Sequence, residues 1–151
     1  MPTARRSRTI AASVEELWEV ICDPHHLPRW WPRVTRVEDV EDGAFTEVMK
    51  TRKGKLVRAD FQLVESDEDA RRIRWAQRIE GTPFARLLKS AETEVRLHGS
   101  AASTAGEATE VTIELRQSLS GFFPRFGGYM VRRAARATID EALDGLERIG
   151  G

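Results

Sequence analysis

The stretch Ser-Val-Glu-Glu-Leu-Trp-Glu-Val-Ile-Cys-Asp-Pro-His-His-Leu-Pro-Arg-Trp-Trp-Pro, residues 13–32, decides how this chain folds. Ser13 is a good helix N-cap, and Glu16 follows it at the spacing of a capping box. Apolar side chains then recur on one face of a first short helix. Asp23 and Pro24 suit the cap and first position of a second helix, which the next prolines should end. The stretch therefore predicts two short helices that finish at a tryptophan pair.

The residues on either side of this stretch predict strands and one long helix. A weak alternation predicts a first strand over about residues 3–11. After the tryptophan pair, runs of alternating or β-branched residues are separated by polar or glycine-containing turns, and the clearest run places Trp75 and Gln77 on one face. Beyond Gly121 apolar residues recur at helical spacing, which predicts a helix of about twenty residues or more. The expected later strands are residues 34–40, 45–52, 56–65, 72–80, 91–97 and 111–119.

Length, charge and cysteine content limit the class of protein. A chain of 151 residues is most simply one domain, residues 1–151, and buries roughly 70% of its unfolded surface. The 24 basic and 24 acidic residues give no overall field that would hold nucleic acid or an anionic membrane. No stretch approaches the roughly 18 apolar residues that span a bilayer, so we expect no integral membrane association. A monomer or a homodimer is expected.

The single cysteine and the N-terminus bear on where the protein resides. Cys22 has no partner for an intrachain disulfide and, beside Ile21, is expected to be a small buried hydrophobe. The first residues lack the apolar core of a signal peptide. We therefore expect a cytoplasmic protein.

The order of elements and two motifs resemble the START and birch-pollen-allergen superfamily, also called SRPBCC. The motifs are Ala-Ser-Val-Glu-Glu-Leu-Trp at residues 12–18 and Asp-Pro-His-His-Leu-Pro-Arg-Trp-Trp-Pro at residues 23–32. Similar runs occur in the bacterial proteins grouped as polyketide cyclase/dehydrase-like. The resemblance implies an α+β helix-grip fold, in which a seven-stranded curved antiparallel sheet and two short helices surround a long C-terminal helix and an apolar cavity. It does not identify a ligand, because a fold alone does not determine function.

Connectivity predicts where such a cavity opens. In an antiparallel meander alternate turns lie at the same end of the sheet, so the turns near Gly54, residues 82–87 and residues 120–127 should cluster. Large apolar side chains on these connections either gate a cavity or plug the open end of the sheet, and both interpretations stay open. The side chains are Trp30, Trp31, Phe84, Leu87, Phe122, Phe123 and Phe126.

Polar residues interrupt the rows that should face the cavity. Gln77 and Gln117 lie in otherwise apolar rows, and burying an unpaired amide costs about 1–3 kcal/mol. Either a wet or ligand-filled cavity avoids that cost, or each amide bonds loop backbone near its strand end. Glu47 is a weak candidate for a catalytic group because desolvation would raise its pKa, but Val48 permits the opposite strand phase. The predicted ligand-binding residues are Trp30, Trp31, Phe61, Trp75, Gln77, Phe84, Gln117, Phe122, Phe126 and Met130.

Other chemistry is not indicated by the sequence. His25 and His26 would point about 100° apart on a helix and do not predict a metal site, and no motif predicts a cofactor. Arg132, Arg133 and Arg136 are able to attract an anionic ligand or surface, but the acidic residues after them favour a solvated helix face.

Three functions follow from these observations. The leading hypothesis is binding or carriage of a small hydrophobic molecule, such as a lipid, an isoprenoid or an aromatic polyketide, because ligand pockets are usually apolar with few polar anchors. The second, implied by the resemblance, is an aromatase/cyclase-type enzyme, but the glutamines cannot shuttle protons and no convincing acid/base pair is present. The third is a protein-interaction module that uses the aromatic end as its interface.

Overall fold

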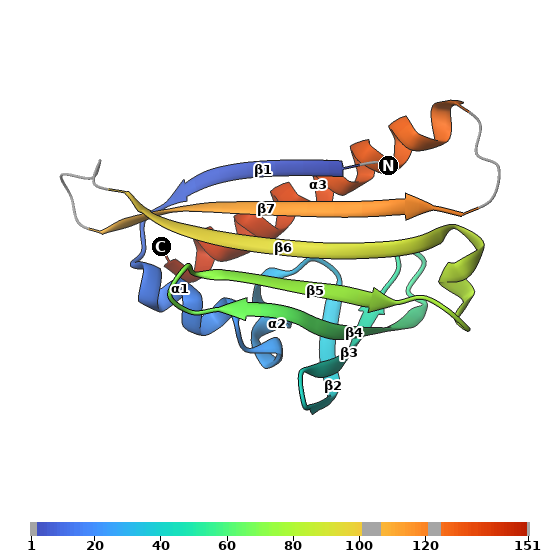
Figure 1. Ribbon diagram of the computed structural model, residues 1–151, viewed down its shortest axis with the longest axis horizontal. Coiled ribbons are helices and arrows are strands. Elements are labelled where there is room, and N and C mark those ends of the chain that lie inside the picture. Colours follow the sequence, from blue (N-terminus) through green and yellow to red (C-terminus); the bar gives the residue numbers. More distant parts are fainter. Residues whose placement is uncertain (1–2, 101–106, 121–124, 151) are drawn as a thin grey trace.

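The computed structural model describes residues 3–100, 107–120 and 125–150 and arranges them as one antiparallel sheet with helices against it (Figure 1). Within these ranges the boundaries of the expected strands and helices agree with the structure to within a few residues at most ends. The elements are β1 (Thr3–Ile10), α1 (Val14–Ile21), the 3-10 turn η1 (Pro24–His26), α2 (Leu27–Trp30), β2 (Val34–Glu41), β3 (Ala44–Lys50), β4 (Leu56–Asp67), β5 (Arg72–Arg78), the 3-10 turn η2 (Pro83–Arg86), β6 (Leu88–Ser100), β7 (Ala108–Leu119) and α3 (Arg125–Gly150).

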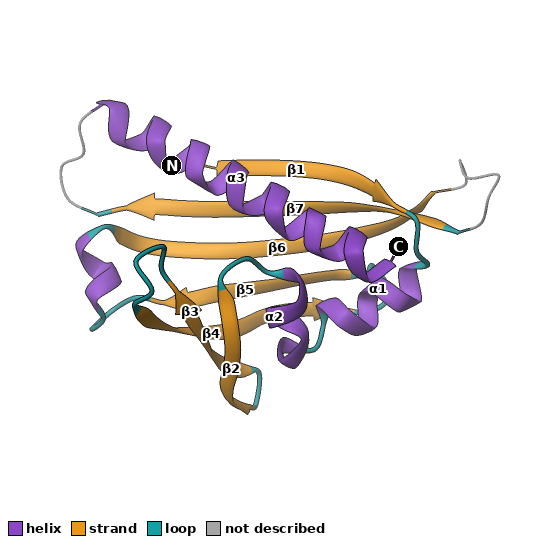
Figure 2. Cartoon of the chain, turned by 180° about the vertical axis from the view of Figure 1, so that it is seen from behind, coloured by secondary structure: helices purple, strands orange, loops and turns teal. Residues whose placement is uncertain are grey.

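The sheet has seven strands in the order β1-β7-β6-β5-β4-β3-β2 within the described residues. The chain leaves β1, forms the short helices, enters the far edge at β2 and returns strand by strand to β7, which pairs with β1. The long helix α3 crosses the inner face of this curved sheet (Figure 2). The structure is therefore the helix-grip fold that the sequence predicts.

The two short helices begin at the predicted caps. The Ser13 hydroxyl oxygen accepts a hydrogen bond from the backbone N–H of Glu16 at 3.1 Å, and the Asp23 carboxylate accepts one from the backbone N–H of His25 at 3.0 Å. One expectation is wrong here, because Cys22 is exposed rather than buried. Cys22 is the C-cap of α1, one residue beyond the buried Ile21, and one residue turns a helix by about 100° away from the apolar face.

The C-terminal half of α3 fills the interior at one end of the sheet. Ile139, Leu143 and Leu146 are at most 1% exposed, and Gly145 lies directly against α2. A Cβ atom at Gly145 would stand 2.4 Å from the carbonyl oxygen of Trp30, so only glycine allows the two helices this approach. This half of the helix therefore leaves no room for a ligand, and any space lies beside its N-terminal half.

No helix in the described part of the chain is both long and apolar enough to cross a membrane.

Candidate ligand cavity

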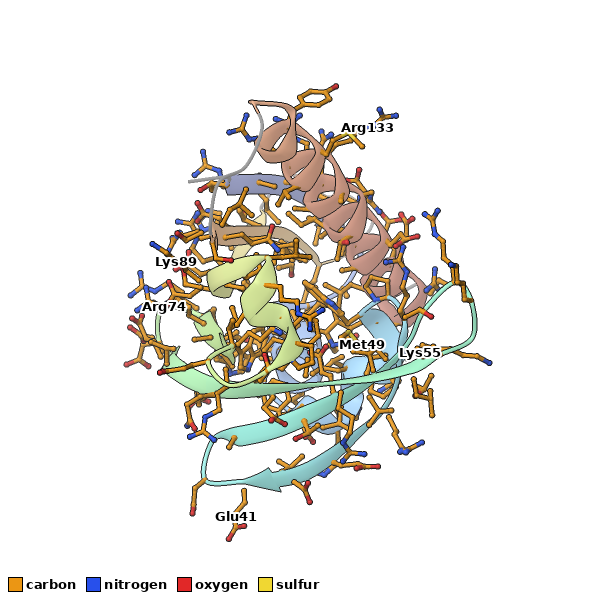
Figure 3. All side chains as sticks on the ribbon, turned by 90° about the vertical axis from the view of Figure 1, so that its right-hand side faces the viewer. Glu41, Met49, Lys55, Arg74, Lys89 and Arg133 are labelled. Atoms are coloured by element: carbon orange, nitrogen blue, oxygen red, sulfur yellow. The ribbon has the colours of Figure 1, made fainter. Side chains whose placement is uncertain are left out.

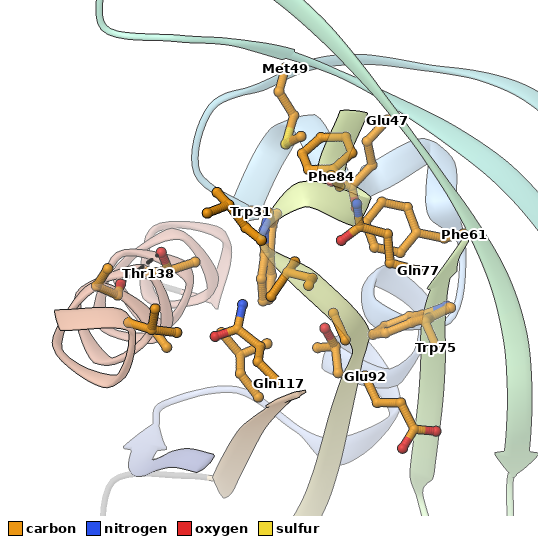
Figure 4. Close-up of a pocket in the computed structure, with 18 of the residues that line it drawn as sticks. Trp31, Glu47, Met49, Phe61, Trp75, Gln77, Phe84, Glu92, Gln117 and Thr138 are labelled. Carbon is orange, nitrogen blue, oxygen red and sulfur yellow. Dashed lines mark hydrogen bonds between the residues drawn. The ribbon is translucent and has the colours of Figure 1, made fainter. Parts of the chain in front are cut away.

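A cavity of about 380 Å³ lies between the N-terminal half of α3 and the inner face of the sheet (Figure 4). For scale, an engineered protein cavity of about 150 Å³ admits benzene, so this one has room for a larger organic molecule. Its lining combines many apolar side chains with a few polar ones, which is the usual composition of a small-molecule site. The lining residues are Leu27, Trp31, Phe45, Glu47, Met49, Phe61, Trp75, Gln77, Phe84, Leu87, Leu88, Ala91, Glu92, Thr93, Leu115, Gln117, Leu119, Val131, Ala134, Ala135 and Thr138.

Three aromatic rings on adjacent strands form the wall opposite α3. Phe45 on β3 and Phe61 on β4 are register partners, and their rings stack with centroids 5.4 Å apart. The edge-to-face pair of Phe45 and Trp75 has centroids 6.4 Å apart and an interplanar angle of 87°. Such aromatic pairs are favourable beyond the area they bury, so this wall is a preformed apolar surface rather than a flexible one.

The cavity reaches the surface beside η2. Leu87, at the C-cap of η2, lines the cavity and is also 59% exposed, so the space continues from the interior to solvent at this point. Two hydrogen bonds of 2.9 Å attach η2 to the end of β7, from the Ser120 hydroxyl to the carbonyl of Ala85 and from the Ser120 backbone N–H to the carbonyl of Leu87. We call this end of the molecule the mouth, and the half-buried Phe84 of η2 lines the cavity beside it.

Two glutamine side chains point into the cavity from β5 and β7 (Figure 4). The side-chain nitrogen of Gln77 is fully buried and has no hydrogen-bond partner among the described residues. Among the described residues, the Gln77 side-chain nitrogen therefore does not bond loop backbone. A buried donor without a partner costs about 1–3 kcal/mol, a cost that a ligand with an acceptor atom would remove.

Among the described residues that line the cavity, Glu47 is the buried ionisable one on the inner face of the sheet. Its side chain is 5% exposed, and its register partners on the neighbouring strands are the apolar Val37 and Ala59. Within the described residues it makes no ion pair and no side-chain hydrogen bond, and desolvation raises its pKa from 4.5 to about 8. At neutral pH the carboxyl group is therefore mainly protonated, and it has an O–H group to donate.

The structure also explains why the sequence did not fix the orientation of this strand. Val48 is 1% exposed although it faces away from the cavity, because the register places it between Arg36 and Arg58 on the outer face. Both arginines pair with Glu38, and this ionic group covers the valine. Because β3 is buried on both faces, no alternation of apolar and polar residues distinguishes its inner side.

Glu92 lines the cavity, but its carboxylate points away from the cavity. The neighbours Ala91 and Thr93 face inward, so Glu92 has the opposite strand phase, and a carboxylate oxygen lies 3.8 Å from the guanidinium of Arg74. Figure 4 shows its carboxylate directed away from the cavity. Of the described residues that line the cavity, none is a lysine, arginine or histidine, so the site offers no positive charge to an anionic ligand.

The structure places the predicted ligand-binding residues in three groups. Trp30 is 2% exposed and packs against α3 in the core, whereas Met130 is 59% exposed, and neither is a lining residue. Phe122 and the side chain of Phe126 lie outside the described residues, as does Phe123 of the predicted apolar set on the connections. The predicted residues that do line the cavity are Trp31, Phe61, Trp75, Gln77, Phe84 and Gln117, together with the weak candidate Glu47.

The predicted ligand-binding set leaves out lining residues on β3 and α3. Phe45 and Met49 line the cavity from the same face of β3 as Glu47, and their i±2 spacing from it is the signal that identifies them once the phase is known. Val131 and Thr138 contribute from α3, where the Thr138 hydroxyl donates to the carbonyl of Ala134 at 3.1 Å.

A helix-grip fold that holds an apolar cavity between sheet and C-terminal helix defines a protein of the START-like class. Residues 1–149 match the family model described as polyketide cyclase / dehydrase and lipid transport, and the chain belongs to this family. Comparison with curated proteins gives no match.

Solved structures share the fold at low sequence identity. A START superfamily protein from Mycobacterium smegmatis superposes with a TM-score of 0.73 at 14% identity, over 96% of this chain and 94% of that one. The di-domain ARO/CYC BexL from the BE-7585A biosynthetic pathway gives a TM-score of 0.78 at 20% identity, over 98% of this chain and 46% of that one. The Zhui aromatase/cyclase from Streptomyces sp. R1128 gives 0.68 at 17% identity, over 97% and 88% of the two chains. At these identities the likeness concerns the fold alone.

Proposed function

We propose that this protein binds a small, largely apolar and uncharged molecule that carries a hydrogen-bond acceptor such as a carbonyl oxygen. The observation that carries the proposal is the pair of donors on the otherwise apolar inner face. Glu47 is buried and mainly protonated at neutral pH, and the Gln77 side-chain nitrogen is buried without a partner. Both are satisfied by an acceptor on the ligand, and both are costly to bury in an empty apolar site.

The absence of basic residues from the described lining decides which hydrophobic molecules fit. A free carboxylate, as in a fatty acid, would lose its hydration without gaining a countercharge, and it would lie near a carboxyl group that has itself been kept neutral. Among lipids, isoprenoids and aromatic polyketides, the proposal therefore favours neutral members with ketone, quinone or ester oxygens.

A matched series of naphthalenes tests this proposal. The ligands are 2-acetylnaphthalene, which has an acceptor, 2-ethylnaphthalene, which has the same shape without one, and 2-naphthoate, which is anionic. We expect the ketone to bind most tightly and the naphthoate most weakly in titrations followed by tryptophan fluorescence, because Trp31 and Trp75 line the cavity. Equal affinity for all three, or preference for the naphthoate, would contradict the proposal.

The second candidate is a cyclase-type enzyme, and the same glutamic acid favours it. A carboxyl group whose pKa is raised to about 8 in an apolar cavity is matched to proton transfer near neutral pH. In an aldol closure it would accept a proton from the carbon beside a carbonyl as carboxylate, and as carboxylic acid it would donate one to the carbonyl oxygen under attack. Gln77 and Gln117 would orient the carbonyl groups without exchanging protons.

Turnover of a poly-β-keto mimic tests the second candidate. An enzyme would show a rate whose pH profile has a limb near pH 8, and the Glu47→Gln variant would lose turnover while it still binds 2-acetylnaphthalene. Equal rates in wild type and Glu47→Gln would exclude Glu47 as the proton-transfer group.

A further inference from the structure

Exposed cations surround the mouth of the cavity on three separate segments. They lie at the β3–β4 turn, at η2 and the start of β6, and on the first turns of α3. Figure 3 looks onto this end of the molecule and shows Lys55, Lys89 and Arg133 on different sides of it. We call them the rim cations: Arg52, Lys53, Lys55, Arg86, Lys89 and Arg133.

Many arginines away from the mouth form ion pairs, although several exposed ones, including Arg5, Arg29 and Arg148, also form none among the described residues. On the outer face of the sheet, Arg72 pairs with Glu65 and Arg116 pairs with Glu114, and between β1 and α3 Arg8 pairs with Asp144. By contrast, no rim cation forms an ion pair within the described portion of the chain. Their positive charge is therefore not neutralised locally and remains available to an outside partner.

Although the net charge of the chain is zero, its exposed acidic and basic residues are unevenly distributed between the two ends of the molecule. Among the described residues of the β3–β4 turn, of the connection from β5 through η2 and of α3 up to residue 134, the exposed acid is Glu80. The opposite end carries exposed acids at the β4–β5 turn, including Glu68 and Asp69, and on α1, including Glu15 (Figure 1). The balance of acidic and basic residues excludes a uniform field but not a basic face at one end.

Large apolar side chains are exposed between the rim cations. Within the described residues, four of the six exposed large hydrophobic side chains belong to this end, namely Leu56, Leu87, Tyr129 and Met130, with exposed fractions of 52–59%. Leu56 follows Lys55 directly, and Leu87 follows Arg86 and also lines the cavity. Apolar side chains interleaved with lysine and arginine are the surface composition that binds the interface of an anionic bilayer.

We propose that the mouth end docks peripherally on a bilayer that contains anionic lipids. The rim cations contact the headgroups, and the exposed apolar side chains enter the boundary between headgroups and acyl chains. The docking proposal depends only on the rim cations and the exposed apolar side chains. If the proposed function also holds, an apolar ligand would pass between bilayer and cavity without crossing water.

A bilayer fits this surface better than nucleic acid does. Nucleic acid binds cations through its phosphates and stacks its bases on aromatic rings. Neither contact requires exposed leucine or methionine side chains. Tyr129 is the aromatic member of the exposed apolar group, whereas Leu56, Leu87 and Met130 are aliphatic. An acidic protein surface would also attract the cations, and the experiment below distinguishes it by the role of the apolar side chains.

Co-sedimentation of the full chain with lipid vesicles tests the docking. Vesicles of phosphatidylcholine alone are compared with vesicles that also contain phosphatidylglycerol, at low and at high salt. The first variant is Lys53→Glu with Lys55→Glu, whose side chains lie outside the cavity lining. Its matched control, Arg29→Glu with Arg148→Glu, makes the same change in net charge at exposed positions of α2 and of the C-terminal end of α3.

We expect binding to the anionic vesicles alone, and weaker binding at high salt. Each basic residue near an anionic surface contributes about fivefold in partitioning, so the Lys53/Lys55 variant should bind at least about 25-fold more weakly. The Arg29/Arg148 control should bind as the wild type does. Leu56→Ser with Tyr129→Ser should also weaken vesicle binding, and circular dichroism verifies that each variant is folded.

Three results would overturn the docking proposal. They are no binding of the wild type to anionic vesicles, equal loss of binding in the rim variant and its control, and unchanged vesicle binding by the Leu56/Tyr129 variant. The last result, together with equally tight binding to polyglutamate or DNA, would identify a general anion-binding surface. The ketone titration without vesicles keeps the two proposals separate, because it depends on the cavity and not on the rim.

Discussion

The pH dependence of stability is the sharpest consequence of the buried Glu47. Its pKa is about 8 in the folded protein and 4.5 when it is freely solvated, so between these pH values the folded state holds a proton that the unfolded state releases. The free energy of unfolding therefore falls as pH rises through this window, by about 1.4 kcal/mol per pH unit. The full cost approaches about 5 kcal/mol above pH 8, and less if water enters the cavity.

Glu47→Gln isolates this contribution, because the amide has nearly the same shape and cannot ionise. We expect wild type and variant to have similar stability near pH 5, and the variant to become the more stable protein by several kcal/mol at pH 9. Urea unfolding at a series of pH values measures the difference. Glu41→Gln, at the exposed last residue of β2, is the matched control and should show no such trend.

A difference in stability between wild type and Glu47→Gln that stays constant from pH 5 to pH 9 would show that folding does not raise the pKa of Glu47. A carbon-13 NMR titration of the Glu47 carboxyl provides an independent measure. A midpoint near 4.5 would show that the group is solvated, and the argument for a neutral ligand with an acceptor would lose its main support.

Three further predictions concern two glycines of α3 and the unpaired donor of Gln77. Gly145→Ala should lower the free energy of unfolding by at least about 2 kcal/mol, because the added Cβ would stand 2.4 Å from the Trp30 carbonyl oxygen. Gly128→Ala, a helical position with nothing within 4 Å of the new Cβ, should instead stabilise the protein by about 0.5–1 kcal/mol in the same urea assay. Gln77→Met should weaken binding of 2-acetylnaphthalene about fivefold or more while it leaves 2-ethylnaphthalene unchanged, since it removes the unpaired donor. An equal loss for both ligands would assign Gln77 a packing role only.

The strands and caps could be predicted from the sequence because each depends on local chemistry. Ser13 and Asp23 accept the expected hydrogen bonds, and the alternation around Trp75 and Gln77 gives their inner phase directly. The orientation of Glu47 could not be predicted, because Val48 on the other face is buried by an ionic group that forms only when β2, β3 and β4 pair. The alternation of apolar and polar residues therefore does not predict which side of a strand faces inward when both of its faces are buried.

The positions of the tryptophans and the charges depend on packing between distant segments. Adjacent residues of a short helix point in different directions, and only the approach of α2 to Gly145 decides that Trp30 enters the core while Trp31 faces the cavity. The basic rim likewise arises because turns far apart in sequence meet at one end, and the summed charge of the chain gives no sign of it.

The position of a bound ligand inside the protein can be measured by NMR. Nuclear Overhauser effects between bound 2-acetylnaphthalene and assigned protein protons report which side chains lie within a few ångströms of it. If the ligand occupies the cavity, we expect contacts with both of its walls, to the Trp75 ring and the Thr93 methyl on the sheet and to the Val131 methyls on α3. Contacts confined to exposed surface residues, or no binding by the folded protein, would contradict the proposed function.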